Sequence, residues 1–308
     1  MSINTNMYKS CNLCPHNCMA DRLNGQSGFC NTGSSYSIAS ICAHKGEEPV
    51  ISGEMGICNV FFYHCNMQCL YCQNYQISKN CVKINLHYTE ENAVKEVCKI
   101  LESGCHALGF VSPSHCIVQM IDIIKKVNKN GYNPVVVYNS NAYDKVDTLK
   151  IIEKKVDVYL PDFKYADDNL AYKLSGVKNY TQTAVKAIKE MIRQKGTGLE
   201  LNDNGIASKG IIIRHLVLPH YIENSRKVLQ IIADNFGNKV HISLMSQYYP
   251  TFQVKDNQTL NKKIESESFD ELVDYLYDLG FENGWVQEID STNNYIPDFE
   301  KEHPFENK

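Results

Sequence analysis

Short apolar runs alternate with segments of helical periodicity along most of this chain, beginning near residue 57. The runs are rich in β-branched and aromatic residues, and the segments between them carry apolar residues three and four positions apart. This alternation is typical of repeated βα units around a parallel sheet. We count six units, with strands predicted at residues 57–63, 107–111, 134–138, 156–160, 210–218 and 239–245. The sequence therefore predicts an α/β fold, with a further short strand at 284–288.

Capping residues and turn signals support this division of the chain. Thr89 is a suitable N-cap for the helix after the first strand. Asp144 or Asp147 is expected to cap the helix after the third strand. The run of Asn, Asp and Gly at 202–205 is a strong turn signal, which predicts a small hairpin before the fifth strand.

Composition excludes several classes of function. The 308 residues carry 31 basic and 35 acidic side chains, a net charge of −4, so we expect no nucleic-acid partner. We find no charged-then-apolar leader and no apolar run near the ~18 residues needed to span a bilayer, so we expect a cytoplasmic protein that does not bind membranes. Thiols stay reduced in that compartment, and the 13 cysteines should therefore bind metal or carry out redox chemistry.

Three of these cysteines form a compact array directly after the first predicted strand. Cys65, Cys69 and Cys72 have the spacing C-x3-C-x2-C. Three thiolates can hold three irons of a cubane cluster and leave the fourth iron open, where a methionine-like ligand can chelate and accept an electron into its sulfonium. A closed ferredoxin loop would add a fourth cysteine two or three residues later. The alternative is a zinc loop that borrows His64 as a ligand.

The array, with Tyr71 directly before its last cysteine, resembles the cluster motif of the radical S-adenosylmethionine superfamily. Further segments resemble a subgroup of uncharacterised radical proteins that are similar to pyruvate formate-lyase activating enzyme. These segments are 11–15, 25–30, 47–49, 51–53, 65–78, 111–115, 138–139, 159–165, 213–219 and 283–288. The resemblance covers nearly the whole chain.

The resemblance implies a partial (β/α)6 barrel at residues 51–290. A Cys-rich, metal-binding segment at 1–50 would precede it, and a C-terminal tail at 291–308 would follow. The array would ligate a [4Fe-4S] cluster that cleaves S-adenosyl-L-methionine reductively, and the 5′-deoxyadenosyl radical would abstract a hydrogen atom from the substrate. Such an oxidoreductase would work under anaerobic conditions with a low-potential electron donor of the flavodoxin or ferredoxin type.

The resemblance also implies six contacts to S-adenosylmethionine: Tyr71, Ser112, Ser114, Asn139, Lys164 and Arg214. The two serines stand where relatives carry a glycine-glycine-acidic motif that contacts the amino group. That motif is absent here, so backbone carbonyls or the serine hydroxyls are the expected acceptors. Tyr71 would flank the adenine, Asn139 would meet the ribose, and Lys164 would reach the carboxylate. The alternative for each polar residue is an ordinary hydrogen bond at a strand end. No catalytic residue is assigned.

Four more cysteines lie near the N-terminus, at Cys11, Cys14, Cys18 and Cys30. Four thiolates close a metal site, and they suit tetrahedral zinc or an auxiliary iron–sulfur cluster equally well. Either group would fasten a segment with little core of its own to the barrel, because metal-binding free energy is folding free energy there. Four unpaired cysteines remain the alternative.

Two substrate classes fit this chemistry. In the first, a protein or peptide donates the hydrogen atom, for instance from a glycyl residue of a partner enzyme, and enters the open barrel as an extended loop. In the second, a small molecule is capped by the aromatic residues Tyr248, Tyr249, Phe252, Trp285 and Tyr295. A third interpretation has no catalysis: an iron–sulfur electron-transfer or zinc-binding module, which would not cleave S-adenosylmethionine.

Overall fold

The computed structural model describes residues 5–85, 87–289, 296–301 and 303–305. Its strands are β1 (Ile38–His44), β2 (Ile57–Phe62), β3 (Ala107–Val111), β4 (Val135–Ser140), β5 (Val158–Pro161), β6 (Leu199–Leu201), β7 (Ala207–Leu216), β8 (His241–Met245) and β9 (Gly284–Val286). Its α-helices are α1 (Pro49–Ser52), α2 (Tyr75–Ser78), α3 (Glu90–Glu102), α4 (Ile117–Lys129), α5 (Val146–Ile152), α6 (Asp168–Ser175), α7 (Tyr180–Lys195), α8 (Ile222–Phe236) and α9 (Ser266–Asp278).

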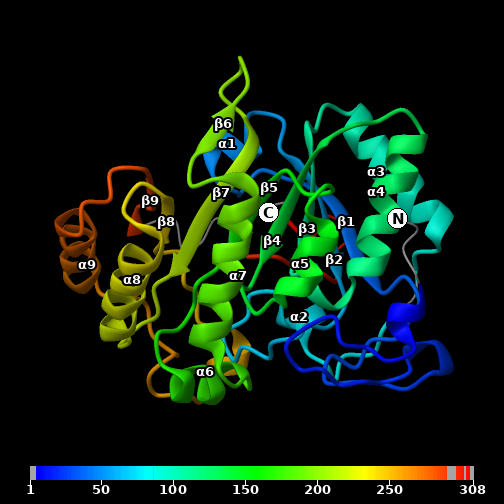
Figure 1. The fold of residues 1–308 in the computed structure, drawn as a ribbon. Coiled ribbons are helices and arrows are strands. Elements are labelled where there is room, and N and C mark those ends of the chain that lie inside the picture. The colour runs from blue at the N-terminus through cyan, green and yellow to red at the C-terminus, as the bar shows by residue number, and fades with distance from the viewer. Residues whose placement is uncertain (1–4, 86, 290–295, 302, 306–308) are drawn as a thin grey trace.

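One nine-stranded sheet organises the fold, in the order β1-β2-β3-β4-β5-β7-β8-β9, with β6 paired to β7. The six predicted strands correspond to β2, β3, β4, β5, β7 and β8, and each pairs in parallel with its neighbour. The sheet curves with its longer helices on the outside and has β1 and β9 at its two edges (Figure 1). The predicted α/β class, as an open barrel behind a Cys-rich N-terminal extension, is confirmed.

The sheet begins earlier in the chain than we predicted. β1 lies within the segment assigned to residues 1–50, yet it pairs antiparallel with β2 from Ile38 opposite Phe62 to His44 opposite Ile57. The predicted boundary at residue 50 therefore falls after a strand that belongs to the sheet. The start of the predicted tail, at 291, lies outside the described residues.

Local signals were correct at some element ends and wrong at others. Thr89 caps α3 by accepting a hydrogen bond from Asn92 N–H, and the predicted hairpin is the β6–β7 pair. The predicted Asp cap of α5 is wrong, because Lys145 is the N-cap residue and makes no side-chain cap. Asp144 is instead buried, and it accepts hydrogen bonds from Tyr138 and Ser140.

Packing closes one end of the barrel and leaves the other open. At the amino ends of the strands an apolar cluster fills the lumen, contributed by Ile51, Ile57, Ala107, Val137, Val158, Leu160, Ala207 and Ile212. Burial of the Val, Leu and Ile side chains among these stabilises the fold by roughly 1.5–3 kcal/mol each. The remaining lumen faces the carboxyl ends, where loops converge in βα architectures.

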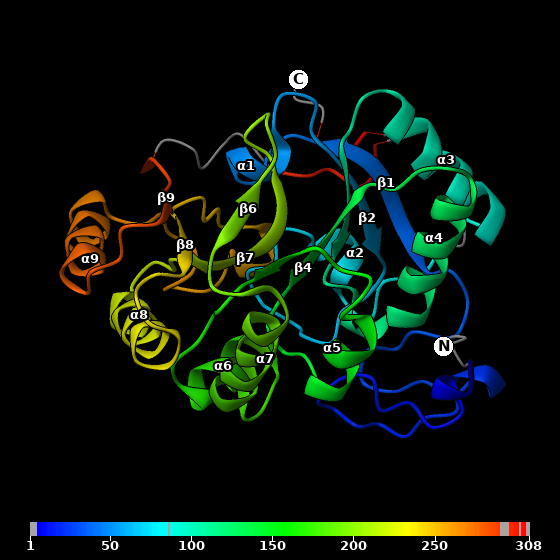
Figure 2. The same cartoon turned by 45° about the horizontal axis from the view of Figure 1, so that its top comes forward.

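The N-terminal extension packs along the side of the barrel near the starts of α4 and α5 (Figure 2). Thr148 of α5 donates a hydrogen bond to the Leu13 carbonyl at 2.7 Å, and Val118 of α4 packs against Tyr8 and Leu13. Through the described part of the chain, the helices all lack the combination of length and apolar character that crossing a bilayer requires.

Candidate functional site

The three-cysteine loop runs from β2 to α2 at the carboxyl ends of the parallel strands. Its backbone is held by the end of α6, because Gln68 N–H donates to the Ser175 carbonyl at 2.9 Å and Leu70 N–H to the Leu174 carbonyl at 2.8 Å. The Gln68 side chain also donates to the Ser78 carbonyl at 3.1 Å. The loop is therefore fixed by the protein's own hydrogen bonds.

Each of the three sulfurs accepts a hydrogen bond. For Cys65, Cys69 and Cys72 in turn, the donors are Met67 N at 3.3 Å, Ser175 Oγ at 3.0 Å and Ser78 Oγ at 3.2 Å. Such donors stabilise thiolate sulfur and tune the reduction potential of an iron–sulfur cluster. The donor set fits a group that binds all three sulfurs as thiolates.

The thiols of Cys65 and Cys69 are buried and protonated when they bind nothing. Burial raises the pKa of Cys65, and neighbouring Cys69 adds to the rise. Burial also raises the pKa of Cys69, against the opposing charge of Lys164. A cationic metal group must displace these protons and supply the charge that stabilises the thiolates.

The arrangement of the three sulfurs is compatible with a cluster. Within the described residues there is no group of three or more His, Cys, Asp or Glu side chains placed to hold a metal ion. The three cysteines instead line one cavity of about 460 Å³. A cubane takes each thiolate at a separate iron, so it does not require the sulfurs to converge on one point.

Five of the six residues expected to contact S-adenosylmethionine line this same cavity: Tyr71, Ser112, Asn139, Lys164 and Arg214. Ser112 has a left-handed backbone, with φ of 45°, and its N–H donates to the Asn139 carbonyl at 2.7 Å. Ser114 is buried behind the cavity wall, where its hydroxyl meets Tyr138 Oη at 3.4 Å. The structure therefore brings together all of these residues except Ser114.

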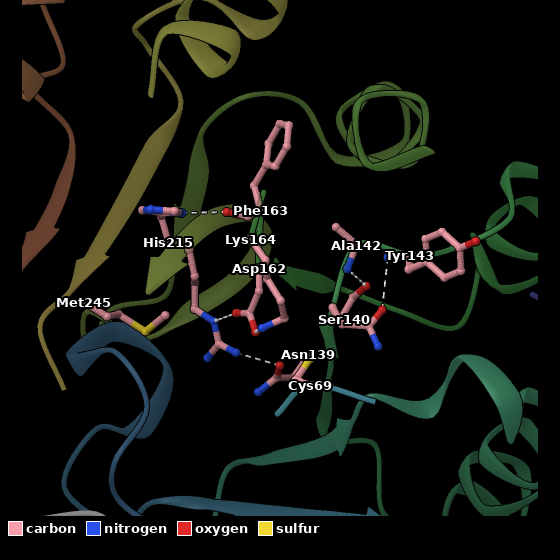
Figure 3. A network of polar contacts seen from close by, with 12 residues as sticks. Cys69, Asn139, Ser140, Ala142, Tyr143, Asp162, Phe163, Lys164, His215 and Met245 are labelled. Carbon is pink, nitrogen blue, oxygen red and sulfur yellow. Dashed lines mark hydrogen bonds and ion pairs between the residues drawn. The ribbon is translucent and has the colours of Figure 1, made fainter. Parts of the chain in front are cut away.

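A charged network crosses the cavity (Figure 3). Arg214 donates from Nε to Asp162 at 2.8 Å, from Nη1 to Glu47 at 2.8 Å and from Nη2 to the Asn139 side chain at 2.6 Å. Lys164 Nζ donates to the other Asp162 oxygen at 2.7 Å. Asp162 thus bridges the two cations that the sequence analysis assigned to the cofactor.

Both ends of the Asp162–Lys164 pair are charged at neutral pH. Burial alone would raise the pKa of Asp162, but Arg214 and Lys164 outweigh it and hold that pKa below its usual range. Burial alone would lower the pKa of Lys164, and Asp162 outweighs it and raises the pKa. An ammonium has three N–H donors, so Lys164 keeps hydrogen-bonding capacity for an anionic group in the cavity.

Tyr71 is tied to the cysteine loop by a chain of hydroxyl groups. Its hydroxyl lies 2.6 Å from that of Tyr165, which lies 2.5 Å from Ser175 Oγ. Ser175 in turn donates to Cys69 Sγ. The chain fixes the Tyr71 ring in the cavity wall.

The predicted aromatic cap is dispersed. Trp285 lines the cavity, whereas Tyr248 is buried and donates from its hydroxyl to the Leu260 carbonyl at 2.5 Å. Phe252 is 65% exposed. Tyr295 lies outside the described residues. Two C-terminal residues that the prediction did not include, Pro297 and Phe305, also line the cavity.

Sequence reasoning assigned no role to Glu47, Glu48, Asp162 or Ser175, which all contact the network, the cavity or a cysteine. The acidic pair between Gly46 and Pro49 was the available signal for the first two. The contacts of Asp162 and Ser175 form only when particular strands and helices pack together, so no local sequence pattern indicates them.

The four N-terminal cysteines gather around a second, smaller cavity. Cys11, Cys14, Cys18 and Cys30 line it together with Leu13, Arg22, Gly28 and His115. Arg22 Nη1 lies 3.7 Å from Cys11 Sγ, and Phe29 N–H donates to Cys18 Sγ at 3.2 Å. A Cβ on Gly28 would lie only 2.7 Å from Cys18 Sγ, so this glycine leaves the space that the sulfur occupies. Burial raises the pKa of Cys14 to about 12.

The N-terminal segment contacts the three-cysteine loop directly. His16 Nε2 lies 2.8 Å from the Asn66 carbonyl, and His64 Nδ1 lies 3.0 Å from the Asn31 carbonyl. His16 and Asn31 each lie close in sequence to one of the N-terminal cysteines. The two cysteine groups are thus joined through one layer of side chains.

Comparisons with known proteins agree with this fold. No protein-family model matches the chain. An uncharacterised protein of Methanocaldococcus jannaschii is 28% identical over 290 residues, which cover 89% of this chain and 76% of that protein. Its name assigns no activity.

Solved structures are similar at lower identity. HydG, a maturase of the [FeFe]-hydrogenase, superposes with a TM-score of 0.50 at 18% identity over 77% of this chain and 53% of HydG. SuiB of Streptococcus suis, solved with S-adenosylmethionine, gives a TM-score of 0.49 at 15% identity over 75% of this chain and 52% of SuiB. The chain thus spans about half the length of these proteins, and the similarity to HydG is one of fold, an open α/β barrel.

Proposed function

We propose that this chain is a radical S-adenosylmethionine enzyme whose [4Fe-4S] cluster is held by Cys65, Cys69 and Cys72. The observation that carries the proposal is the set of three sulfurs, each with its own hydrogen-bond donor, on the wall of a cavity of about 460 Å³. When bound, the cluster would supply the electron that cleaves S-adenosylmethionine, whose nucleoside fragment removes a hydrogen atom from the substrate.

The chain's own residues would orient the cofactor. The Lys164 ammonium, which is fixed by Asp162, would attract the carboxylate, and Asn139, which is held by Arg214, would meet the ribose. Tyr71 would flank the adenine with its ring fixed by Tyr165. These three side chains are held in position before the cofactor binds, which lowers the entropic cost of aligning it.

We propose a protein or peptide as the hydrogen donor, which includes the activation of a glycyl radical enzyme. The sheet leaves β1 and β9 as separate edges, so an extended segment could reach the cavity from the side. A low-potential flavodoxin or ferredoxin would supply the electron, and cytoplasmic, anaerobic conditions would preserve the cluster.

A small molecule is the second candidate. Trp285, Pro297 and Phe305 line the cavity from the C-terminal part of the chain, where they narrow access. Apolar walls with a few polar groups are typical of small-molecule pockets.

We further propose that Cys11, Cys14, Cys18 and Cys30 bind a second metal group, zinc or an iron–sulfur cluster. Their common cavity and the donors to Cys11 and Cys18 support this proposal. Because the N-terminal segment contacts the three-cysteine loop through His16 and Asn31, a metal group in that segment would support the loop that holds the first cluster.

Formation of 5′-deoxyadenosine tests the proposed chemistry. Anaerobically reconstituted protein with dithionite and S-adenosylmethionine should produce it, and Cys65→Ala, Cys69→Ala and Cys72→Ala should each abolish it. Cys81→Ala, at an exposed cysteine outside the cavity, is the matched control and should retain activity. Full turnover in any of the three loop variants would refute the assignment.

A further inference from the structure

The cavity that contains the cysteine loop has a floor made by the turn between β1 and α1. His44 pairs with Ile57, the first residue of β2, so the chain beyond His44 lies at the amino ends of the parallel strands. Figure 1 accordingly shows α1 and α2 at opposite ends of the sheet. Glu47 and Glu48, on this turn, line the same cavity as the three cysteines.

The backbone of the floor and the cysteine loop lie at opposite ends of β2, and the Glu47 side chain reaches into the cavity as far as Asn59, the third residue of that strand. β2 has six residues, and at about 3.3 Å per residue such a strand spans about 20 Å. A cofactor held at the loop and a molecule held at the floor would therefore meet end to end in one cavity.

Among the described residues that line the cavity, two of the three carboxylates are already paired with cations. Glu47 pairs with Arg214 at 2.8 Å and also accepts a hydrogen bond from Asn59 Nδ2 at 3.1 Å. Asp162 pairs with both Arg214 and Lys164. His44 is the remaining basic side chain on the wall, and burial lowers its pKa, so it is neutral at neutral pH.

Glu48 is the third carboxylate. It interacts with the charge of Arg214 and is hydrogen-bonded to Ser243, but it has no ion pair of its own among the described residues. Its side chain is buried, with the residue only 8% exposed, and its Oε2 atom has no hydrogen-bond partner among the described residues. Burial raises the pKa of Glu48, while the charge of Arg214 opposes the rise. A buried carboxyl oxygen without a partner costs stability, and a substrate that supplies one would recover that cost on binding.

We propose that the substrate carries a positively charged nitrogen, an ammonium or a guanidinium, that pairs with Glu48 at the floor of the cavity. The inference rests on the proposed function, of which it specifies the substrate class. When Glu48 is ionised, the three carboxylates that line the cavity outnumber its two cations, Arg214 and Lys164, by one. A cation neutralises that charge and also donates the missing hydrogen bond, whereas a neutral hydroxyl or amide would supply only the bond.

Calorimetric titration of the reconstituted protein with matched probes tests this inference without turnover. The peptide probes are N-acetyl-lysine amide and its uncharged counterpart N-acetyl-norleucine amide, and the small-molecule probes are pentylamine and 1-pentanol. We expect each cation to bind about tenfold or more tightly than its neutral counterpart, which corresponds to about 1.4 kcal/mol. The cation that binds more tightly shows whether a peptide side chain or a small amine supplies the positively charged nitrogen.

The variant Glu48→Gln keeps the shape of the side chain and removes its charge. It should lose the preference for cations, while Glu54→Gln, at an exposed residue beyond α1, should keep it. Thermal unfolding supplies an independent measurement: Glu48→Gln should unfold at the same or a higher temperature than the wild type, whereas a structural ion pair would make it less stable.

Equal binding of the charged and neutral probes, failure of every probe to bind, or an unchanged cation preference in Glu48→Gln would overturn the inference. The proposed function fails by a different measurement, namely when the reconstituted protein forms no 5′-deoxyadenosine, whatever the probes bind.

Discussion

Removing the charge of Asp162 should destabilise the protein far more than breaking an exposed ion pair. Asp162→Asn leaves the Lys164 ammonium without its 2.7 Å partner, in a side chain only 14% exposed. Arg214, 10% exposed, loses one of its two carboxylates. Breaking a buried pair in this way costs about 3–5 kcal/mol, because the stranded charge stays desolvated. At about 2 °C per kcal/mol for a chain of this size, the midpoint of thermal unfolding should fall by about 6–10 °C.

The measurement is urea unfolding of the wild type, Asp162→Asn and the exposed control Glu200→Gln. Glu200 is 64% exposed beside Lys209, 44% exposed, so breaking that pair should cost only about 0–1 kcal/mol. The double variant Asp162→Asn/Lys164→Met should recover part of the loss by removing the stranded ammonium. A loss below about 1 kcal/mol for Asp162→Asn would refute the argument, because the network would then be as well solvated as the exposed pair.

Three further predictions concern single contacts. Ser175→Ala removes the donor to Cys69 Sγ and should lower the midpoint potential of the reconstituted cluster in a redox titration; an unchanged potential would contradict a role for that hydrogen bond. Gly28→Ala places a methyl group 2.7 Å from Cys18 Sγ and should reduce the metal content of the N-terminal site, measured by elemental analysis against Gly33→Ala, where a Cβ meets no atom within 4 Å. Burial lowers the pKa of His215 to about 4; since its unfolded pKa is about 6.5, its contribution to stability is complete above that pH and is lost as the pH falls toward 4, by up to about 1.4 kcal/mol per pH unit. His215→Gln should flatten this part of the stability profile, and an unchanged slope would contradict the assignment.

The parallel strands were predictable because they are buried on both faces and leave continuous apolar runs in the sequence. β1 was not predictable in this way, since Ser40, Cys42 and neighbouring small residues form no continuous apolar run. α6 was missed because it is short, although Asp167 caps it through Asn169 and Leu170 N–H. Periodicity detects long elements, and it is weak for a four-residue to eight-residue helix held by tertiary contacts.

The candidate site was predictable to different depths for different residues. The cysteine array can be recognised from its spacing alone, and its position after β2 followed from the strand pattern. The partners of Asp144 could not be predicted from the sequence. A helix cap was expected, and the carboxylate instead accepts hydrogen bonds from Tyr138 and Ser140. The roles of Glu47 and Glu48 depend on a turn folding back over the lumen, which no local pattern specifies.

The most direct test of the central claim is the paramagnetic resonance spectrum of the reduced cluster before and after S-adenosylmethionine is added. If Cys65, Cys69 and Cys72 hold a [4Fe-4S] cluster with one open iron, the cofactor should bind that iron and change the spectrum of the wild type and of Cys81→Ala alike. An identical spectrum with and without the cofactor, in protein with full iron content, would contradict the account.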